Sequence, residues 1–109
     1  MDDVTSWDRE DWTGASLSRF EADDATFNAC LFRNAELYNA RLTTATFIDC
    51  DFSGARLAGS NLFGARLIGC KLLGVDFTDD IVLTGVTFER CQLDLANFRN
   101  VSLSKMRFD

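Results

Sequence analysis

The residues of this chain that could carry chemistry are four cysteines, because histidine is absent. They stand at Cys30, Cys50, Cys70 and Cys91, so successive gaps are 20, 20 and 21 residues. A zinc site needs four ligands that converge tetrahedrally, whereas this even spacing predicts thiols placed in a line. Neighbouring thiols could be close enough for a disulfide, but parallel side chains in register point the same way and would strain one. We therefore interpret the column as small buried apolar residues and expect no metal.

Other catalytic arrangements are also missing from the sequence. The absence of histidine removes the commonest general base and metal ligand. The glycines recur five residues apart and never form a phosphate-binding loop. We predict that the chain is not an enzyme and has no catalytic residue and no cofactor.

Charge is concentrated at one end of the chain. The net charge is −6. Residues 1–24 hold eight acids and two bases, whereas residues 25–109 hold nine of each. A neutral body lacks the basic footprint of a nucleic-acid-binding protein, so we expect a protein partner and no direct binding of nucleic acid. No apolar run is long enough to span a membrane, and the first residues do not resemble a signal peptide, which predicts a cytoplasmic location with reduced thiols.

A five-residue period organises the large apolar residues. From Leu17 onward, 18 of 19 positions at this spacing are Leu or Phe, although these two types make up only 23 of the 109 residues. One extra residue near Asp79 and Asp80 shifts the phase once. The predicted structural core consists of Phe27, Phe32, Phe47, Phe52, Leu57, Leu62, Leu67, Leu72, Phe77, Leu83, Phe88, Leu93, Phe98 and Leu103.

A second, mostly small apolar series lies two residues before the first, and it contains the four cysteines. The residues between the two series are mostly polar. This alternation places both apolar series on the same side of an extended segment. All seven glycines fall two residues after a large apolar position. Glycine permits a positive φ there, so each five-residue unit is predicted to end in a tight turn without proline.

The units Ala55–Gly59, Ser60–Gly64 and Ala65–Gly69 closely match the repeat Ala-(Asp/Asn)-Leu-x-x. In this the chain resembles the pentapeptide-repeat family over residues 15–109, and the phase holds back to Trp12 and Trp7. The resemblance implies an all-β fold, a right-handed quadrilateral parallel β-helix with four units per coil. The 20-residue spacing of the cysteines independently supports that coil length. We expect between four and five coils.

Outward positions that carry apolar residues are candidate contacts. A contiguous exposed patch of this kind is typical of an interface, although scattered outward apolar residues are also common in solenoids. Ile48 and Ile68 are predicted to stack in one column, and Phe63, Ile68 and Leu73 to lie on three successive sides of one coil. The candidate interface residues are Tyr38, Ile48, Phe63, Ile68 and Leu73.

The two ends of a solenoid need covering, because an uncapped coil exposes its core and its backbone. We interpret residues 1–14, which are acidic and carry Trp7 and Trp12, as an N-terminal cap, and residues 15–109 as the β-helix. The chain stops at Asp109, one residue after Phe108, with nothing resembling a cap. We expect the natural protein to continue, with end-on dimerisation of this chain as a consequence; stacking of complete copies is the alternative.

Two functions remain open from the sequence. The segment Phe88–Phe98 contains a stretch similar to Cys-x-Leu-x-Leu-Ala-Asn-Phe of the quinolone-resistance subgroup. That resemblance implies a DNA-mimicking protein that binds and protects a type II topoisomerase, either DNA gyrase or topoisomerase IV. A DNA mimic should carry acid along its whole length, and residues 25–109 are neutral. The alternative is a structural or self-associating scaffold with another protein partner and no topoisomerase role.

Overall fold

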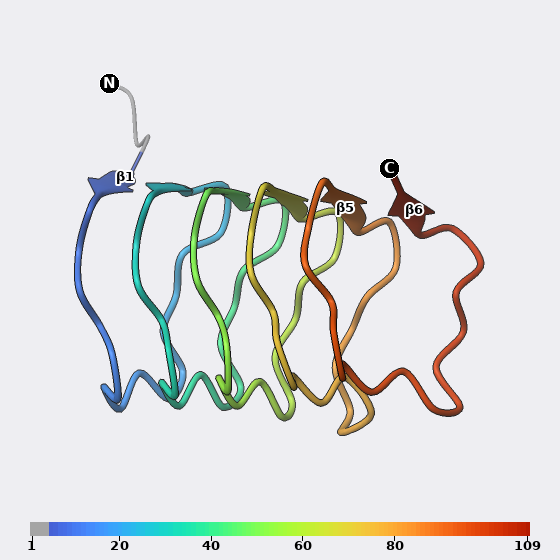
Figure 1. The fold of residues 1–109 in the computed structure, drawn as a ribbon. Coiled ribbons are helices and arrows are strands. Elements are labelled where there is room, and N and C mark those ends of the chain that lie inside the picture. The colour runs from blue at the N-terminus through green and yellow to red at the C-terminus, as the bar shows by residue number, and fades with distance from the viewer. Residues whose placement is uncertain (1–4) are drawn as a thin grey trace.

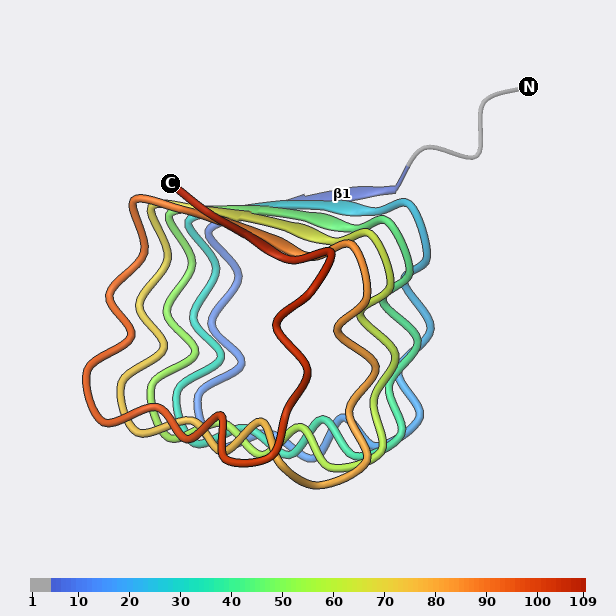
Figure 2. The ribbon, with the colours of Figure 1, turned by 90° about the vertical axis from the view of Figure 1, so that its right-hand side faces the viewer.

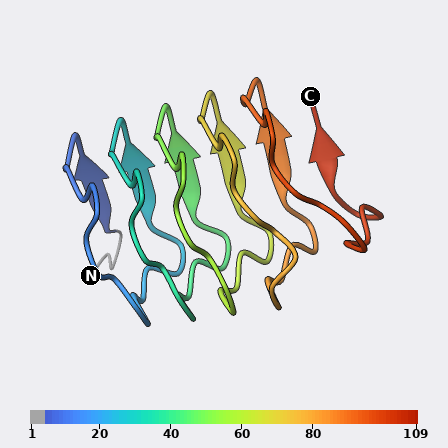
Figure 3. The same cartoon turned by 60° about the horizontal axis from the view of Figure 1, so that its bottom comes forward.

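The computed structural model describes residues 5–109, and within them the regular structure is entirely β. Six short strands form one parallel sheet in sequence order (Figures 1 and 3). They are β1 (Ser6–Asp8), β2 (Thr26–Asn28), β3 (Thr46–Ile48), β4 (Arg66–Ile68), β5 (Thr87–Glu89) and β6 (Arg107–Phe108). Each strand pairs with the next one a coil later, so the predicted parallel β-helix is confirmed, with about five coils between β1 and β6.

Coils one to five begin at β1 to β5, respectively. Each coil has four sides, which we number from the strands. Side one contains the strands. The other sides are identified by their large inward residues. Side two contains Trp12, Phe32, Phe52, Leu72 and Leu93; side three contains Leu17, Leu37, Leu57, Phe77 and Phe98; side four contains Ala22, Leu42, Leu62, Leu83 and Leu103. Seen from the C-terminal end, the chain runs counter-clockwise as it advances toward the viewer (Figure 2). This is a right-handed coil.

The corners are made by residues with positive φ. The backbone is left-handed at seven glycines and thirteen other residues from Arg9 to Lys105. Each lies two residues after a large inward position, except Asp80, which lies three residues after Phe77. The predicted glycine corners are therefore confirmed. A hydrogen-bonded turn closes the corners after sides two, three and four, except at the phase shift, as where the Ala35 N–H donates to the Phe32 carbonyl at 3.0 Å. The corners after the strands are bends. At Gly54 a Cβ would also meet Oδ1 of the Asn34 side chain one coil below, so a larger residue there would require that side chain to move.

The core runs along the axis as stacked side chains. Phe27 and Phe47 stack with ring centroids 4.8 Å apart, and Phe32 and Phe52 do so at 4.7 Å. Nearly all the predicted core residues are buried. The exceptions lie in the last coil, where Leu93 and Phe98 are partly buried and Leu103 is 49% exposed, because this coil has a neighbour on only one of its two sides.

Residues 6–14 belong to the first coil by their pairing. β1 pairs in register with β2, Asp11 pairs with Leu31, and Trp7 stacks on Phe27 at 4.8 Å. Both tryptophans take the inward position of the large apolar series, so the backbone pairing shows no boundary at Gly14. Residues 1–4 of the predicted cap lie outside the described residues, and the capping role of the segment stays a prediction.

The extra residue forms a bulge between sides three and four of coil four. The left-handed corner falls at Asp80, and the Asp79 carbonyl accepts from the Gly59 N–H at 2.9 Å. Asp79 thus takes the ladder position that Tyr38 and Ala58 hold in the two preceding coils. There the Tyr38 carbonyl accepts from the Arg19 N–H, and the Ala58 carbonyl accepts from the Asn39 N–H. Thr78 is the residue that the ladder leaves out.

Candidate interaction surfaces

The four cysteines form the predicted inward column. Cys30, Cys50 and Cys70 are fully buried, and Cys91 is half-buried. Each thiol lies against a main-chain carbonyl of the preceding coil, from Cys30 Sγ to Trp7 O at 3.6 Å to Cys91 Sγ to Leu67 O at 3.1 Å. All four are free thiols. Within residues 5–109, no three metal-ligating side chains converge on a common point.

Hydrogen bonding shifts the pKa values of Cys70 and Cys91, the two thiols at the C-terminal end of this column, in opposite directions. A hydrogen bond that the Cys70 thiol can donate to the Cys91 thiolate lowers the pKa of Cys91 to about 7, against the opposing effect of its partial burial. The hydrogen bonds of Cys70 to its neighbouring thiols, followed by burial, raise the pKa of Cys70 itself. Cys91 therefore combines a lowered pKa with partial exposure, the two properties that favour reaction of a thiolate.

The five candidate interface residues are distributed over all four sides. Ile48 and Ile68 pair directly on side one and are half-buried. Phe63 on side four is 48% exposed and Leu73 on side two is 37% exposed. Tyr38 lies on side three. The structure therefore brings together only the isoleucine pair, and the interface stays a prediction.

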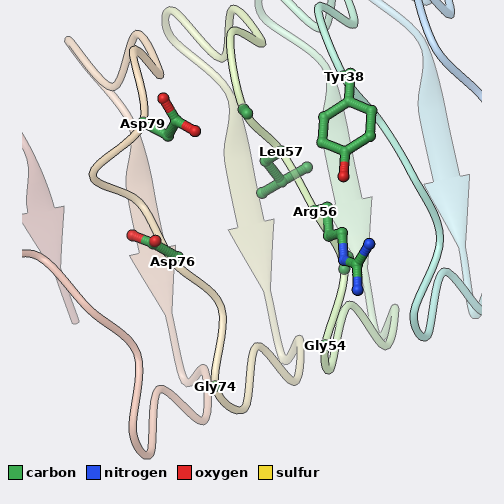
Figure 4. A pocket seen from close by; sticks show the side chains of 9 residues that line it. Tyr38, Gly54, Arg56, Leu57, Gly74, Asp76 and Asp79 are labelled. Carbon is green, nitrogen blue, oxygen red and sulfur yellow. The ribbon is translucent and has the colours of Figure 1, made fainter.

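Side three carries a hollow that the periodic pattern does not reveal. Ala58 stands between Tyr38 and Asp79, and because its side chain is one methyl group, it leaves a gap in the column of outward side chains. The hollow has a volume of about 290 Å³ and is lined also by Arg56 and Asp76. Figure 4 shows Tyr38 and Asp79 at opposite ends of it. The sequence signal for this hollow was an outward alanine, Ala58, one coil before the phase shift. The position of Asp79 could not be read from the sequence, because it depends on where the bulge lies.

The charged groups of the hollow are unevenly compensated. Arg56 lies 4.0 Å from Glu36, and the Tyr38 hydroxyl and Glu36 together raise the pKa of Arg56. Asp76 accepts hydrogen bonds from the Thr78 hydroxyl and backbone N–H, which lower the pKa of Asp76. Neither Asp76 nor Asp79 has an ion-pair partner among the described residues. The wall on the side of coil four is therefore negative.

The fold and its repeat agree with comparisons against known proteins. The family model "Pentapeptide repeat region" matches residues 20–98, so the chain belongs to the pentapeptide-repeat family. No match was found among curated proteins. Residues 5–109 contain no helix that could cross a membrane, because they form only strands, turns and bends.

Solved structures with the same repeat are similar over most of the chain. HetL of the cyanobacterium Nostoc, described as involved in heterocyst differentiation regulation, is 21% identical with a TM-score of 0.49; the match covers 82% of this chain and 49% of HetL. Rfr23 of Cyanothece is 18% identical, with 96% and 81% covered and a TM-score of 0.42. QnrB1, a plasmid-mediated fluoroquinolone resistance protein, is 18% identical, with 95% and 80% covered and a TM-score of 0.49. The chain thus spans about half the length of HetL.

Proposed function

We propose that this protein is a non-enzymatic interaction module that binds another protein through the outside of its solenoid. The observation that carries the proposal is that large apolar side chains are exposed at outward positions of the coils, although the core inside the coils is well filled. Phe63, Leu73 and Val82 are 48%, 37% and 41% exposed. Exposed apolar area of this kind is stabilised by contact with a partner.

The specific partner that we propose is a type II topoisomerase. The segment Phe88–Phe98 supports it through its similarity to the quinolone-resistance subgroup. The described part of coil one adds a second argument, since its exposed side chains include six acids and two bases. The acids are Asp8, Glu10, Asp11, Glu21, Asp23 and Asp24. Carboxylates around one coil can replace DNA phosphates on a basic surface, although coils two to five carry no such excess.

A DNA gyrase supercoiling assay with and without a fluoroquinolone tests this partner. We expect micromolar protein to inhibit supercoiling or to protect the enzyme from the drug. The triple variant Asp8→Asn, Glu10→Gln, Asp11→Asn should weaken the effect, because it removes three charges from coil one. If the unmodified chain gives neither inhibition nor protection, DNA gyrase is ruled out as the partner; the same result in a topoisomerase IV decatenation assay would leave the scaffold alternative.

A self-associating scaffold is the second candidate, supported by the paired Ile48 and Ile68 and the exposed Phe63. In that case the double variant Phe63→Asp, Ile68→Asp should keep its circular dichroism spectrum and sediment as a monomer at concentrations where the unmodified chain forms dimers. Ser18→Asp is the matched control, because Ser18 is exposed on side three. Unchanged association of the double variant would exclude this surface.

A further inference from the structure

We infer that the hollow on side three, between Tyr38 and Asp79, is a binding slot for an arginine side chain of a protein partner. This inference rests on the proposed interaction function and names the chemistry of one contact. The slot comprises Tyr38, Arg56, Ala58, Asp76 and Asp79. Its two end walls come from coils two and four, and its floor comes from coil three (Figure 4).

The dimensions of the slot follow from the ladder. The carbonyls of Tyr38, Ala58 and Asp79 accept hydrogen bonds from equivalent corner residues in successive coils, at 2.8, 2.9 and 2.9 Å. Neighbouring coils are about 4.8 Å apart, so the backbones of the two walls are separated by about 10 Å. With only a methyl group between them, this separation admits one flat group of side-chain thickness.

The bulge creates the negative wall. Without the extra residue, Thr78 would hold the ladder position next to Ala58, and a neutral hydroxyl would face the slot. The inserted residue instead places Asp79 there, with its carboxylate exposed and without an ion-pair partner among residues 5–109. Asp76 adds a second carboxylate, held by Thr78. The phase break in the sequence thus has a chemical consequence at the surface.

The charges and the aromatic wall together select the ligand. Arg56 is compensated by Glu36 at 4.0 Å, so the two aspartates leave an excess negative charge that a cation would balance. Tyr38 lies at the opposite end of the slot with its ring face turned outward, where a group lying over the slot can stack on it (Figure 4). A guanidinium group is planar, stacks on aromatic rings and pairs with a carboxylate through two parallel hydrogen bonds. A lysine ammonium matches the charge but lacks the flat shape.

The test uses the whole chain and N-acetyl-L-arginine N-methylamide as the probe, titrated while backbone amide resonances are recorded by NMR. We expect saturable shifts at Tyr38, Ala58 and Asp79, with a dissociation constant on the order of millimolar for a single side chain. The citrulline analogue, which has the same shape without the charge, should produce no saturable shift. The lysine analogue should bind more weakly.

Two variants locate the site. Asp79→Asn and Tyr38→Leu should each weaken binding of the arginine probe by about threefold or more. Asp94→Asn is the control, because it removes the same charge from an exposed residue on side two. Thermal melting checks that all three variants remain folded. Equal binding of the citrulline analogue, shifts centred elsewhere, or an equal effect of Asp94→Asn would overturn the inference. The supercoiling assay is independent of this result.

Discussion

Ser60 is a polar residue in a column that is otherwise apolar. Its column contains Phe20, Ala40, Ile81 and Val101, and its fully buried hydroxyl has no hydrogen-bond partner within residues 5–109. A buried hydroxyl without a partner costs about 1–3 kcal/mol in folding free energy. We expect Ser60→Ala to raise the free energy of unfolding by about 1 kcal/mol.

Urea denaturation followed by circular dichroism measures this change. Ser18→Ala is the control, since Ser18 is exposed and its substitution should change stability by less than about 0.5 kcal/mol. A loss of stability in Ser60→Ala would show that the hydroxyl has a partner in solution.

Cys91 differs from the other three cysteines in both exposure and acidity. It is half-buried, and the pKa of its thiol is lowered to about 7 by hydrogen bonding from Cys70. At pH 7 we therefore expect iodoacetamide to alkylate Cys91 first in the native protein, with a rate that rises through pH 7 rather than near the ordinary thiol pKa. Mass spectrometry of the tryptic peptides identifies the labelled site.

Replacing Cys70, which donates this hydrogen bond, should raise the pKa of the Cys91 thiol. In Cys70→Ala the alkylation of Cys91 should shift to higher pH, because the thiolate loses its hydrogen bond. Cys30→Ala is the control, since Cys30 lies two coils before Cys70 and is therefore further from Cys91. The same pH profile in all three proteins would contradict the role of Cys70.

The bulge in coil four interrupts the ladder to coil five. In coil three, the Leu62 N–H and the Ser60 carbonyl both pair with Val82, at 2.9 and 3.0 Å. The matching Leu83 N–H and Ile81 carbonyl of coil four have no backbone partner among the described residues, and an opening of about 370 Å³ lies beside them. The extra residue of coil four has no counterpart in coil five, so the two segments differ in length.

Deleting Asp79 should restore this ladder. Coil four would then have 20 residues like its neighbours, and the Leu83 N–H could donate to the Ser102 carbonyl. We expect slower hydrogen exchange at the Leu83 amide and a gain of about 1 kcal/mol in unfolding free energy for each bond formed. Leu62, already bonded, is the internal reference. Unchanged or faster exchange at Leu83 would show that the insertion does not cause the opening.

The same bulge marks the limit of what the sequence predicts. The Cys column, the glycine corners and the stacked phenylalanines follow from position modulo five, because a repeated environment demands a repeated residue type. An extra residue anywhere between Phe77 and Leu83 gives the same later phase, so periodicity cannot place it. Its site is decided by which carbonyl meets the Gly59 N–H and which residue adopts positive φ. The slot at Ala58 depends on that choice and was not predicted.

At the scale of the whole molecule, stability is distributed along one axis. Among residues 5–109, each strand contacts only the strands of the neighbouring coils, so a central strand has partners on both sides and a terminal strand on one. Phe47 illustrates the first case, because its ring stacks on Phe27 of the preceding coil at 4.8 Å, it pairs with Leu67 of the following coil, and it is 1% exposed. Phe108 illustrates the second, at 5.2 Å from Phe88 and 46% exposed.

The two phenylalanines should therefore respond differently to the same truncation. We expect Phe47→Ala to lower the free energy of unfolding by about 3–5 kcal/mol, as for a buried aromatic in a closed core. Phe108→Ala should cost about 1 kcal/mol, since it removes roughly half of the burial. Phe47→Ala should also accelerate hydrogen exchange throughout the sheet, because it divides the stack, whereas Phe108→Ala should affect only β5 and β6. Equal losses from both truncations would mean that the rod unfolds as a single unit in which position along the axis has no influence.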